Sequence, residues 1–543
     1  TPGPFVVAWP GSGLPLVEQA GRPLLVERRL GQGRVNYAAL DLAASPFDAW
    51  AGAAGFWQAL LTPGSDYPPG APPDVSPRLA RADSMSYVLQ NLPALALPSI
   101  GWLAGLLGVY ILLAGPISYF VLRRLRRLAW GWLSIPALTL LFSIGAFCFA
   151  YQVRGGDVIV NKLSLIDLGH AQRSMETYVG IFSPARRAYT LSFPGQALIS
   201  PLAIENSPWG QGGPLAPAGA EIVEGEPAQV RAVQVNQWAM QGFHVESPLP
   251  PGWEIASDIR VGGDRLQGTI TNCMDETLVD SVLVLGTRYL RLGELPPGHQ
   301  VTLDQALGAG ASPNQQPFPY GLFESYGMEA GPRGLSRALQ TRQQVLANYF
   351  QTWGGPAQPP ADVTLIGWLQ SSPLAVQVEG VGGRWSTQQT SMVVAPLQVR
   401  YGPGPIHLAP GDLISQATGG QGEVGICGPA NQVYLVNGQV TLEFTLPAGL
   451  RDMQVSRLSL FIEGGGSDTP IPAVELADRS GQWVRISSPK MGRNELSDPA
   501  RFIAGGTLRL RLSSEAGAMG QGAACLSYLP DVVGEMPAGT SEP

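Results

Sequence analysis

The sequence predicts a membrane-anchored, mainly β protein. A two-helix transmembrane hairpin is followed by tandem β-sandwich and jelly-roll domains and preceded by a partial α/β segment. Two long apolar stretches without charged residues flank an arginine cluster, which predicts the hairpin. Elsewhere short apolar runs alternate with turn residues, and 68 Gly and 49 Pro in 543 residues suit many short strands. The expected parts are a partial α/β segment (1–61), a linker (62–94), the hairpin (95–153), a β-sandwich with an inserted helix at 335–353 (154–400) and a jelly-roll-like domain (401–543).

The composition argues against several function classes. The 34 Lys and Arg against 41 Asp and Glu give a net charge of −7, which does not suit a nucleic-acid partner. Four Cys do not suit a disulfide framework, and four His do not suit a multi-histidine metal site. We therefore expect no metal, no cofactor and no nucleic acid.

Residues 1–61 contain strand-like runs followed by one helix. The runs are 5–9, 23–30 and 34–42, with a hairpin turn between the last two. A Ser-Pro pair at 45–46 is a helix-start signal, so we expect a helix from there to Leu61. The following residues, as far as 83, are rich in Pro and polar side chains and predict a semi-extended linker that leads to the membrane.

This first segment resembles the tail of a class I glutamine-amidotransferase-like domain, as found in bacterial membrane proteins. The resemblance rests on the run GRPLLVERRLGQGRVNYAALDLAASPF (21–47) and on the helix that carries Trp50, Phe56 and Trp57. It covers only about 60 residues, which is short for a whole α/β domain.

Enzymes of that family use a Cys nucleophile and a His. The first Cys here is Cys148, within an apolar stretch, and the first His is His170, so no catalytic residue carries over. Because the segment is short and the chain starts at Thr1, we expect a processed or truncated form of a longer protein.

The two apolar stretches, 95–122 and 128–153, are each longer than the about 20 residues that cross a membrane as a helix. Neither shows the polar face that a buried core helix of this length would have. We therefore expect a tight antiparallel transmembrane hairpin with the lipid bilayer as its partner.

Four arginines lie in the five residues between the spans: Arg123, Arg124, Arg126 and Arg127. Short loops rich in Arg stay on the cytoplasmic side, so both termini and the large C-terminal region are expected outside the cytoplasm of a two-pass cell-membrane protein. An anionic-lipid or nucleotide site is the alternative interpretation of this cluster. A small-residue face on the first span could pack on the second helix or on another subunit; it comprises Gly101, Gly105, Gly108 and Gly115.

After the hairpin, short apolar runs broken by turn residues predict β-sandwiches. Residues 265–303 form the clearest unit, in which Asn272 precedes a polar turn, and they resemble β-sandwich modules of bacterial extracytoplasmic proteins. The helix at 335–353 carries an apolar stripe of Leu335, Leu339, Leu346 and Phe350, which either packs on its own sandwich or binds a partner.

The last 143 residues resemble jelly-roll modules akin to carbohydrate-binding domains. A disulfide between Cys427 and Cys525 would suit an oxidising compartment, although free thiols are equally consistent with the sequence. Acidic turns at 464–470 and 475–483 could hold Ca²⁺ or form ordinary turns.

No catalytic set is evident, because no histidine accompanies a recognisable nucleophile motif. The order of parts is similar to auxiliary subunits encoded beside ABC transporters, including gliding-motility types, which implies an accessory role near a permease. The leading hypothesis is a non-enzymatic, extracytoplasmic accessory or structural subunit that binds partner proteins in a membrane or surface complex.

The alternative is a cell-envelope glycan-binding protein or carbohydrate-active enzyme that uses the last domain. An exposed row of tryptophans on one sheet face would favour this alternative. A catalytic glutamine amidotransferase is a third hypothesis and would require an upstream half.

Overall fold

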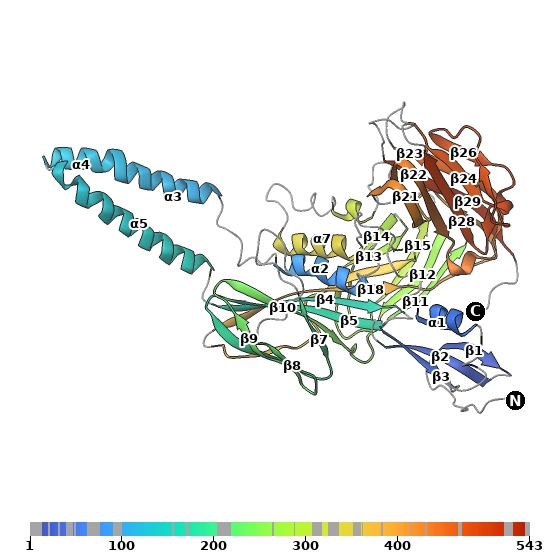
Figure 1. The fold of residues 1–543 in the computed structure, drawn as a ribbon, viewed down its shortest axis with the longest axis horizontal. Coiled ribbons are helices and arrows are strands. Elements are labelled where there is room, and N and C mark those ends of the chain that lie inside the picture. Colours follow the sequence, from blue (N-terminus) through green and yellow to red (C-terminus); the bar gives the residue numbers. More distant parts are fainter. Residues whose placement is uncertain are drawn as a thin grey trace.

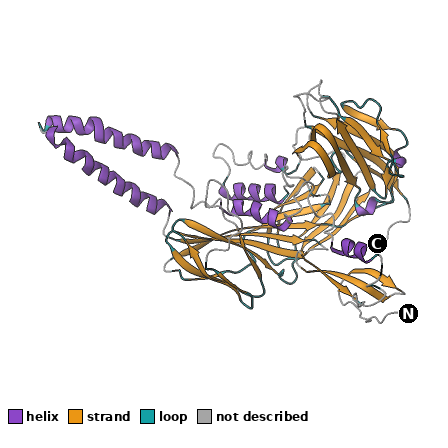
Figure 2. Ribbon diagram, viewed as in Figure 1, coloured by secondary structure: helices purple, strands orange, loops and turns teal. Residues whose placement is uncertain are grey.

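The computed structural model shows a β-rich body from which two antiparallel helices project (Figure 1). Strands dominate the body and helices form the projection (Figure 2), so the protein is mainly β as expected. The structure describes residues 14–19, 22–30, 33–39, 47, 50, 52–61, 77–90, 100–126, 128–154, 157–169, 173–202, 219–262, 265–286, 288–306, 318–323, 336–350, 360, 362–381, 384–413, 415–428, 432–464, 470–514 and 525–537.

A small N-terminal unit consists of an antiparallel sheet and one helix. Its strands pair in sequence order and are β1 (Leu14–Gln19), β2 (Arg22–Leu30) and β3 (Gly33–Ala38). The sequence predicted the last two strands but not β1, and the strand expected at 5–9 lies outside the described residues. Helix α1 spans Ala53–Leu61, and the helix start expected at 45–46 also lies outside the described residues.

An eight-stranded sheet forms the centre of the body. Its spatial order is β14-β13-β16-β18-β4-β5-β10-β7, with β18 and β4 parallel and the other neighbours antiparallel. The strands are β4 (Val158–Leu168), β5 (Arg173–Ser183), β7 (Leu198–Leu202), β10 (Ala239–Ser247), β13 (Leu278–Leu285), β14 (Arg288–Leu295), β16 (Thr364–Leu369) and β18 (Trp385–Pro396).

Two smaller four-stranded sheets lie against one face of this central sheet. Their orders are β17-β6-β9-β8 and β15-β12-β11-β19. Along β4, Val158 and Val160 pack with the first small sheet, whereas Ile166 and Leu168 on the same face pack with the second. The expected sandwich at 154–400 is therefore two sandwiches that share one sheet. The small-sheet strands are β6 (Arg187–Phe193), β8 (Glu221–Val223), β9 (Ala228–Val235), β11 (Ile255–Gly262), β12 (Arg265–Asn272), β15 (Gln300–Ala306), β17 (Gln377–Glu379) and β19 (Val399–Tyr401).

Two helices, α2 (Pro77–Gln90) and α7 (Arg337–Tyr349), cover the opposite face of the central sheet. α2 buries Met85, Val88 and Leu89 in the same cluster as Tyr178. The prediction of a linker over 62–94 is therefore wrong for residues 77–90, because the apolar side of this helix completes the core of the body.

Helix α7 lies within the range expected for the inserted helix, 335–353, and its apolar side faces the sheet rather than a partner. Leu346 is fully buried, and Leu339 and Phe350 pack against the same cluster. The side chain of Ser336 accepts a hydrogen bond from the Leu339 backbone N–H at 3.4 Å, which caps the first turn. Leu335 lies outside the described residues.

The C-terminal domain is built on one connected sheet with the path β25-β24-β28-β22-β29-β23-β26. β22 and β29 pair through only two residue pairs, so they divide the strands into two groups. Strand β20 adds to β29, β21 to β22 and β27 to β28. The strands are β20 (Gly404–Leu408), β21 (Ser415–Gly428), β22 (Gln432–Thr445), β23 (Gln454–Glu463), β24 (Ala473–Ala477), β25 (Trp483–Arg485), β26 (Gly492–Leu496), β27 (Ile503–Ala504), β28 (Thr507–Ser514) and β29 (Leu526–Met536).

The projecting helices form two arms that meet at a short turn (Figure 1). The first arm runs through α3 (Ile100–Leu112), a π-helical turn (Leu113–Ile117) and α4 (Ser118–Arg124). Pro116 lies inside the π-helical turn, which accommodates a residue that lacks the N–H of a regular helix. The second arm is a 3₁₀ turn (Leu128–Trp130) followed by α5 (Gly131–Arg154).

Candidate functional site

The exposed apolar surface of the two projecting helices is the most conspicuous candidate site. Of the described helices, one (Ala104–Arg124) is long and apolar enough to cross a membrane, with a mean hydropathy of 1.9 and none of its most apolar stretch buried. A shorter apolar helical segment, Gly131–Ala146, belongs to the other arm. Most of the exposed large apolar side chains lie on these arms, including Leu107 (58% exposed), Trp132 (78%) and Leu141 (67%).

Polar and aromatic contacts join the two arms near the turn. Tyr110 Oη and Thr139 Oγ1 lie 3.0 Å apart, and the Tyr110 and Phe142 rings meet edge to face at 5.4 Å. Closer to the turn, the hydroxyls of Ser118 and Ser134 lie 3.5 Å apart. These contacts hold the arms together on one side, while the apolar side chains of both arms point outward.

The small-residue face of the first arm makes no close contact with the side chains that the structure describes. A Cβ added at Gly101, Gly105, Gly108 or Gly115 would meet no described atom within 4 Å. Packing of these glycines on the second helix of the hairpin stays a prediction. Packing on another subunit remains a prediction.

The arginine cluster lies at the far tip of the projection. Arg123 and Arg124 occupy the last turn of α4, and Arg126 adopts a left-handed conformation (φ 55°) in the turn that reverses the chain. Arg127 lies outside the described residues. The positive charges are thus at the end of the hairpin that is farthest from the body (Figure 1).

The two ends of the hairpin meet in the body. α2 ends ten residues before α3 begins, and β4 begins four residues after α5 ends. The Asn161 side chain on β4 donates a hydrogen bond to the Leu89 carbonyl of α2 at 3.0 Å. The chain therefore leaves the body and returns to the same place, so both flanks of the hairpin lie on one side of it.

A buried polar cluster fixes α2 at this place. Arg81 of α2 forms an ion pair with Glu176 of β5 at 3.5 Å and lies over the Tyr349 ring of α7, 5.1 Å from its centroid. The Tyr178 hydroxyl donates to Glu176 at 3.0 Å, and His244 Nε2 lies 3.5 Å from the same carboxylate. Glu176 and His244 are each 3% exposed in their side chains.

The cluster shifts the acidity of its members in different directions. Burial raises the pKa of Glu176, but contacts with His244, Arg81 and Tyr178 together outweigh burial and hold the pKa below its usual value. Burial raises the pKa of Asp167, which lies in the same cluster, even though the Gly169 N–H donates to it at 2.8 Å. At neutral pH Glu176 is therefore ionised and pairs with the cation on α2.

Sequence reasoning missed this cluster because its members are far apart along the chain. The structure buries His244 between two glutamates and stacks it on Tyr178, with ring centroids 4.8 Å apart. A signal was present in α2 itself, since Ala82, Met85 and Leu89 recur at helical spacing.

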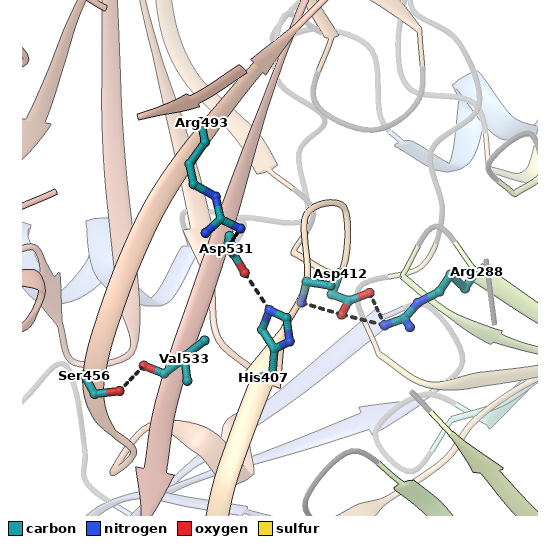
Figure 3. A network of polar contacts seen from close by, with 8 residues as sticks. Arg288, His407, Asp412, Ser456, Arg493, Asp531 and Val533 are labelled. Atoms are coloured by element: carbon teal, nitrogen blue, oxygen red, sulfur yellow. Dashed lines mark hydrogen bonds and ion pairs between the residues drawn. The ribbon is translucent and has the colours of Figure 1, made fainter. Parts of the chain in front are cut away.

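A second network joins the central sheet to the C-terminal domain (Figure 3). Arg288 of β14 donates to both carboxylate oxygens of Asp412, at 2.5 and 2.6 Å, and Asp412 also accepts the Ala409 N–H at 2.8 Å. Nearby, Asp531 is fully buried and lies 2.6 Å from His407 Nε2 and 3.2 Å from Arg493 Nη2. The Arg288–Asp412 pair bridges the central sheet and the C-terminal domain, whereas the contacts of Asp531 lie within that domain.

Two other residues that the sequence singled out make hydrogen bonds that stabilise local structure. Asn272 is fully buried and donates to the carbonyls of Glu276 and Leu295, at 2.9 and 2.8 Å. Asp478, in one of the acidic turns, accepts hydrogen bonds from the Ser480 hydroxyl, the Arg501 guanidinium and two backbone N–H groups, and these lower its pKa to about 2. The part of the chain that the structure describes contains no group of three or more metal-ligating side chains.

The cysteines and tryptophans test two further expectations. Cys273 is free and exposed, and Cys525 is in a disulfide, whereas the Cys427 side chain lies outside the described residues. Trp253 and Trp368 are buried, and Trp483 lies under the Arg511 guanidinium at 4.4 Å. The described residues therefore show no exposed row of tryptophans for stacking sugars.

Two regions of the chain match families of unknown function. Residues 254–400 match a domain of unknown function (DUF8725), and residues 407–527 match a second one (DUF8815). The Arg288–Asp412 ion pair joins the two matched regions. None of the curated proteins compared with this chain matches it.

Among solved structures, a crystal structure of the plant receptor-like kinase ANX2 aligns over 67% of this chain and 83% of its own. Its identity is 10% and its TM-score is 0.12.

Proposed function

We propose that this chain is a non-enzymatic, membrane-anchored accessory subunit whose body lies outside the cytoplasm and binds partner proteins in a membrane or surface complex. The observation that carries the proposal is the outward-facing apolar surface of the two arms. An exposed apolar surface of this extent needs a cover, and a bilayer supplies one along the whole hairpin.

The hairpin matches the dimensions of a bilayer. The 24 residues of α5 make a helix about 36 Å long, enough for a hydrocarbon core of about 30 Å. Trp130 and Trp132 are exposed close to the arginine tip, where aromatic side chains favour the membrane interface. The arginine tip then faces the cytoplasm under the positive-inside rule.

A two-pass topology agrees with the position of α2 and β4, the elements that flank the hairpin in the sequence. α2 and β4 pack in one body and are joined by the Asn161–Leu89 hydrogen bond. A single crossing would separate these two elements across the membrane. Two crossings keep them together, so both termini and the body are on the extracytoplasmic side in this proposal.

The body supplies a rigid structure for partner binding. The C-terminal strands divide into two groups at β22 and β29, which supports the jelly-roll-like arrangement as part of the proposal. The open glycine face of the first arm offers a surface on which a helix of a partner subunit can pack closely.

Topology labelling tests the anchor directly. In intact cells, a membrane-impermeant maleimide is expected to label the native Cys273, which is exposed on the body. In a Cys273→Ser background, a Leu125→Cys substitution at the hairpin turn is expected to react only after permeabilisation. Reaction of both positions from the outside would overturn the two-pass topology.

Gentle detergent extraction from native membranes, followed by native mass spectrometry, tests the accessory role. A stable complex with other membrane proteins supports the proposal. A monomer under several mild detergents would overturn partner binding but leave the anchor intact.

A further inference from the structure

The end of the body from which the hairpin emerges carries a group of arginines and tryptophans. The register of the central sheet identifies this end: Val158, the first residue of β4, pairs with Trp385, the first residue of β18. The next strand reaches the same end, because Ile159 pairs with Phe182 of β5. The turns that follow bring Arg186, Arg187 and Trp238 to this end, and Arg384 precedes β18. We call Arg186, Arg187, Trp238, Arg384 and Trp385 the rim.

Four of the five rim residues are exposed, whereas Trp238 packs against Phe182. Trp385 is 42% exposed, and Arg186, Arg187 and Arg384 are exposed. Among the residues that the structure describes, none of these three arginines forms an ion pair, unlike Arg81 and Arg288 elsewhere in the body. Asp157, beside Val158, and Glu379, which pairs with Thr190 of β6, are exposed acidic neighbours, and the three arginines outnumber them.

The chain holds the rim close to the end of the hairpin. Only residues 155–157 separate the last residue of α5, Arg154, from Val158. Four residue steps span at most about 14 Å, so the start of β4 cannot lie farther than that from the end of the helix. The polar headgroup layers add about 5–8 Å on each side of the hydrocarbon.

We propose that the rim binds the headgroups of anionic phospholipids, with Trp385 in the interfacial layer and the three arginines on the phosphates. This inference rests on the proposed membrane anchor. Exposed tryptophans favour the membrane–water interface, and arginines attract an anionic surface within a Debye length. The rim fixes the orientation of the body, so that the central sheet stands on the membrane by one end.

The full chain, reconstituted in lipid nanodiscs, provides the test. A fluorophore is attached at Trp385→Cys in a Cys148→Ala, Cys273→Ser background, and the lipid carries a nitroxide on its headgroup. The native Cys273, labelled in a Cys148→Ala chain, is the matched distant probe. Cys273 follows β12, and its backbone N–H donates a hydrogen bond to the Glu254 carbonyl. Arg173, at the start of β5, donates to the neighbouring Trp253 carbonyl, which places Cys273 near the other end of the central sheet. The 11 residues of β4 place these ends about 36 Å apart.

The proposal predicts quenching at position 385, little quenching at Cys273, and stronger quenching at 385 when phosphatidylglycerol replaces part of the phosphatidylcholine. The combined R186E, R187E and R384E substitutions should abolish that increase. The same charge change at distant exposed arginines, R451E with R457E and R485E, should leave it intact. Equal quenching at 385 in neutral and anionic discs would overturn the role of the arginines.

A third probe separates the two proposals. A fluorophore at Leu107→Cys should be quenched by a nitroxide on the lipid acyl chain. If this probe is quenched and position 385 is not, the anchor stands and the rim proposal fails. If Leu107→Cys is not quenched, the anchor fails, and the rim proposal fails with it.

Discussion

The hairpin and the body place the same residue types in opposite environments. Trp132 in the hairpin is 78% exposed, whereas Trp368 in β16 is 1% exposed beneath α7. Strands of the central sheet are covered on both faces by helices or by smaller sheets, so most apolar side chains in them are buried. In the described part of the chain, each arm of the hairpin packs only against one side of the other arm. The body is therefore stabilised by its own layers, whereas the hairpin needs an external apolar phase.

The largest expected effect contrasts two tryptophans. Trp368→Ala should lower the free energy of unfolding of the body by about 3–5 kcal/mol, because it leaves a cavity beneath α7. Trp132→Ala should leave that free energy unchanged, because the side chain packs on nothing in the body. Urea unfolding of the detergent-solubilised full chain, followed by pulse proteolysis of the body, measures both. Equal losses in the two variants would contradict the contrast.

The next prediction compares an arginine introduced into the hairpin with an arginine introduced on the surface of the body. Leu107→Arg puts a cation in the apolar first arm, and because an arginine at a bilayer centre costs about 2.5–3.5 kcal/mol, membrane integration should fall. Leu198→Arg, at an exposed leucine of the body, is the matched control and should integrate normally. Resistance of the chain to alkaline carbonate extraction gives the measurement. Full retention of Leu107→Arg in the membrane would contradict the anchor.

A smaller effect concerns the cluster that ties α2 to the body at the root of the hairpin. The folded-state pKa of Glu176 is lowered, so its ionised form stabilises the fold above the usual glutamate value near 4.5, and this stabilisation is lost as pH falls through the folded-state pKa. Glu176→Gln should cost about 1.5–3 kcal/mol at pH 7, the usual range for hydrogen bonds to charged groups, and should flatten stability below pH 4.5.

The matched control is Glu443→Gln, which removes a more exposed carboxylate in an ion pair with Arg509. Unfolding free energies at pH 7 and across the acid range compare the two variants. An unchanged acid dependence in Glu176→Gln would contradict the role of the carboxylate.

The sequence predicted the parts of the molecule whose signal is local. The absence of charge over 84–122 and the arginines beyond it locate the first arm. Helix α7 was also predictable, because its apolar stripe and its Ser336 cap are contained within residues 335–350. Mainly β structure followed from turn residues between short apolar runs.

The remaining features depend on contacts between distant segments. Helix α2 was taken as linker because its Arg and Asp side chains hide a narrow apolar stripe, although Pro77 at its first position is a start signal. The Arg81–Glu176 pair joins residues 95 positions apart, and Arg288–Asp412 joins residues 124 apart. No local pattern in a single sequence specifies such pairs. The sharing of one sheet by two sandwiches likewise depends on pairing between distant strands, so it could not be predicted.

The last prediction tests whether the central sheet and the C-terminal domain unfold as one unit. The Arg288–Asp412 pair is partly buried, with side chains 23% and 12% exposed, and it bridges the central sheet and the C-terminal domain. The parts also share one apolar cluster, and the chain passes from β19 to β20 through only two residues. A double-mutant cycle of Arg288→Ala and Asp412→Ala should therefore give a coupling energy of about 1 kcal/mol in the unfolding of the C-terminal domain. The control is the cycle Arg265→Ala with Asp304→Ala, a more exposed ion pair within one small sheet, which should give a smaller coupling energy.

Hydrogen exchange of β20 and β29 would locate the loss of stability. Faster exchange confined to these strands indicates that the contact between the domains loosens while the rest of the domain stays folded. A coupling energy of zero would mean that the shared apolar cluster alone holds the domains together, and the body would then differ from the hairpin only in what covers its apolar side chains.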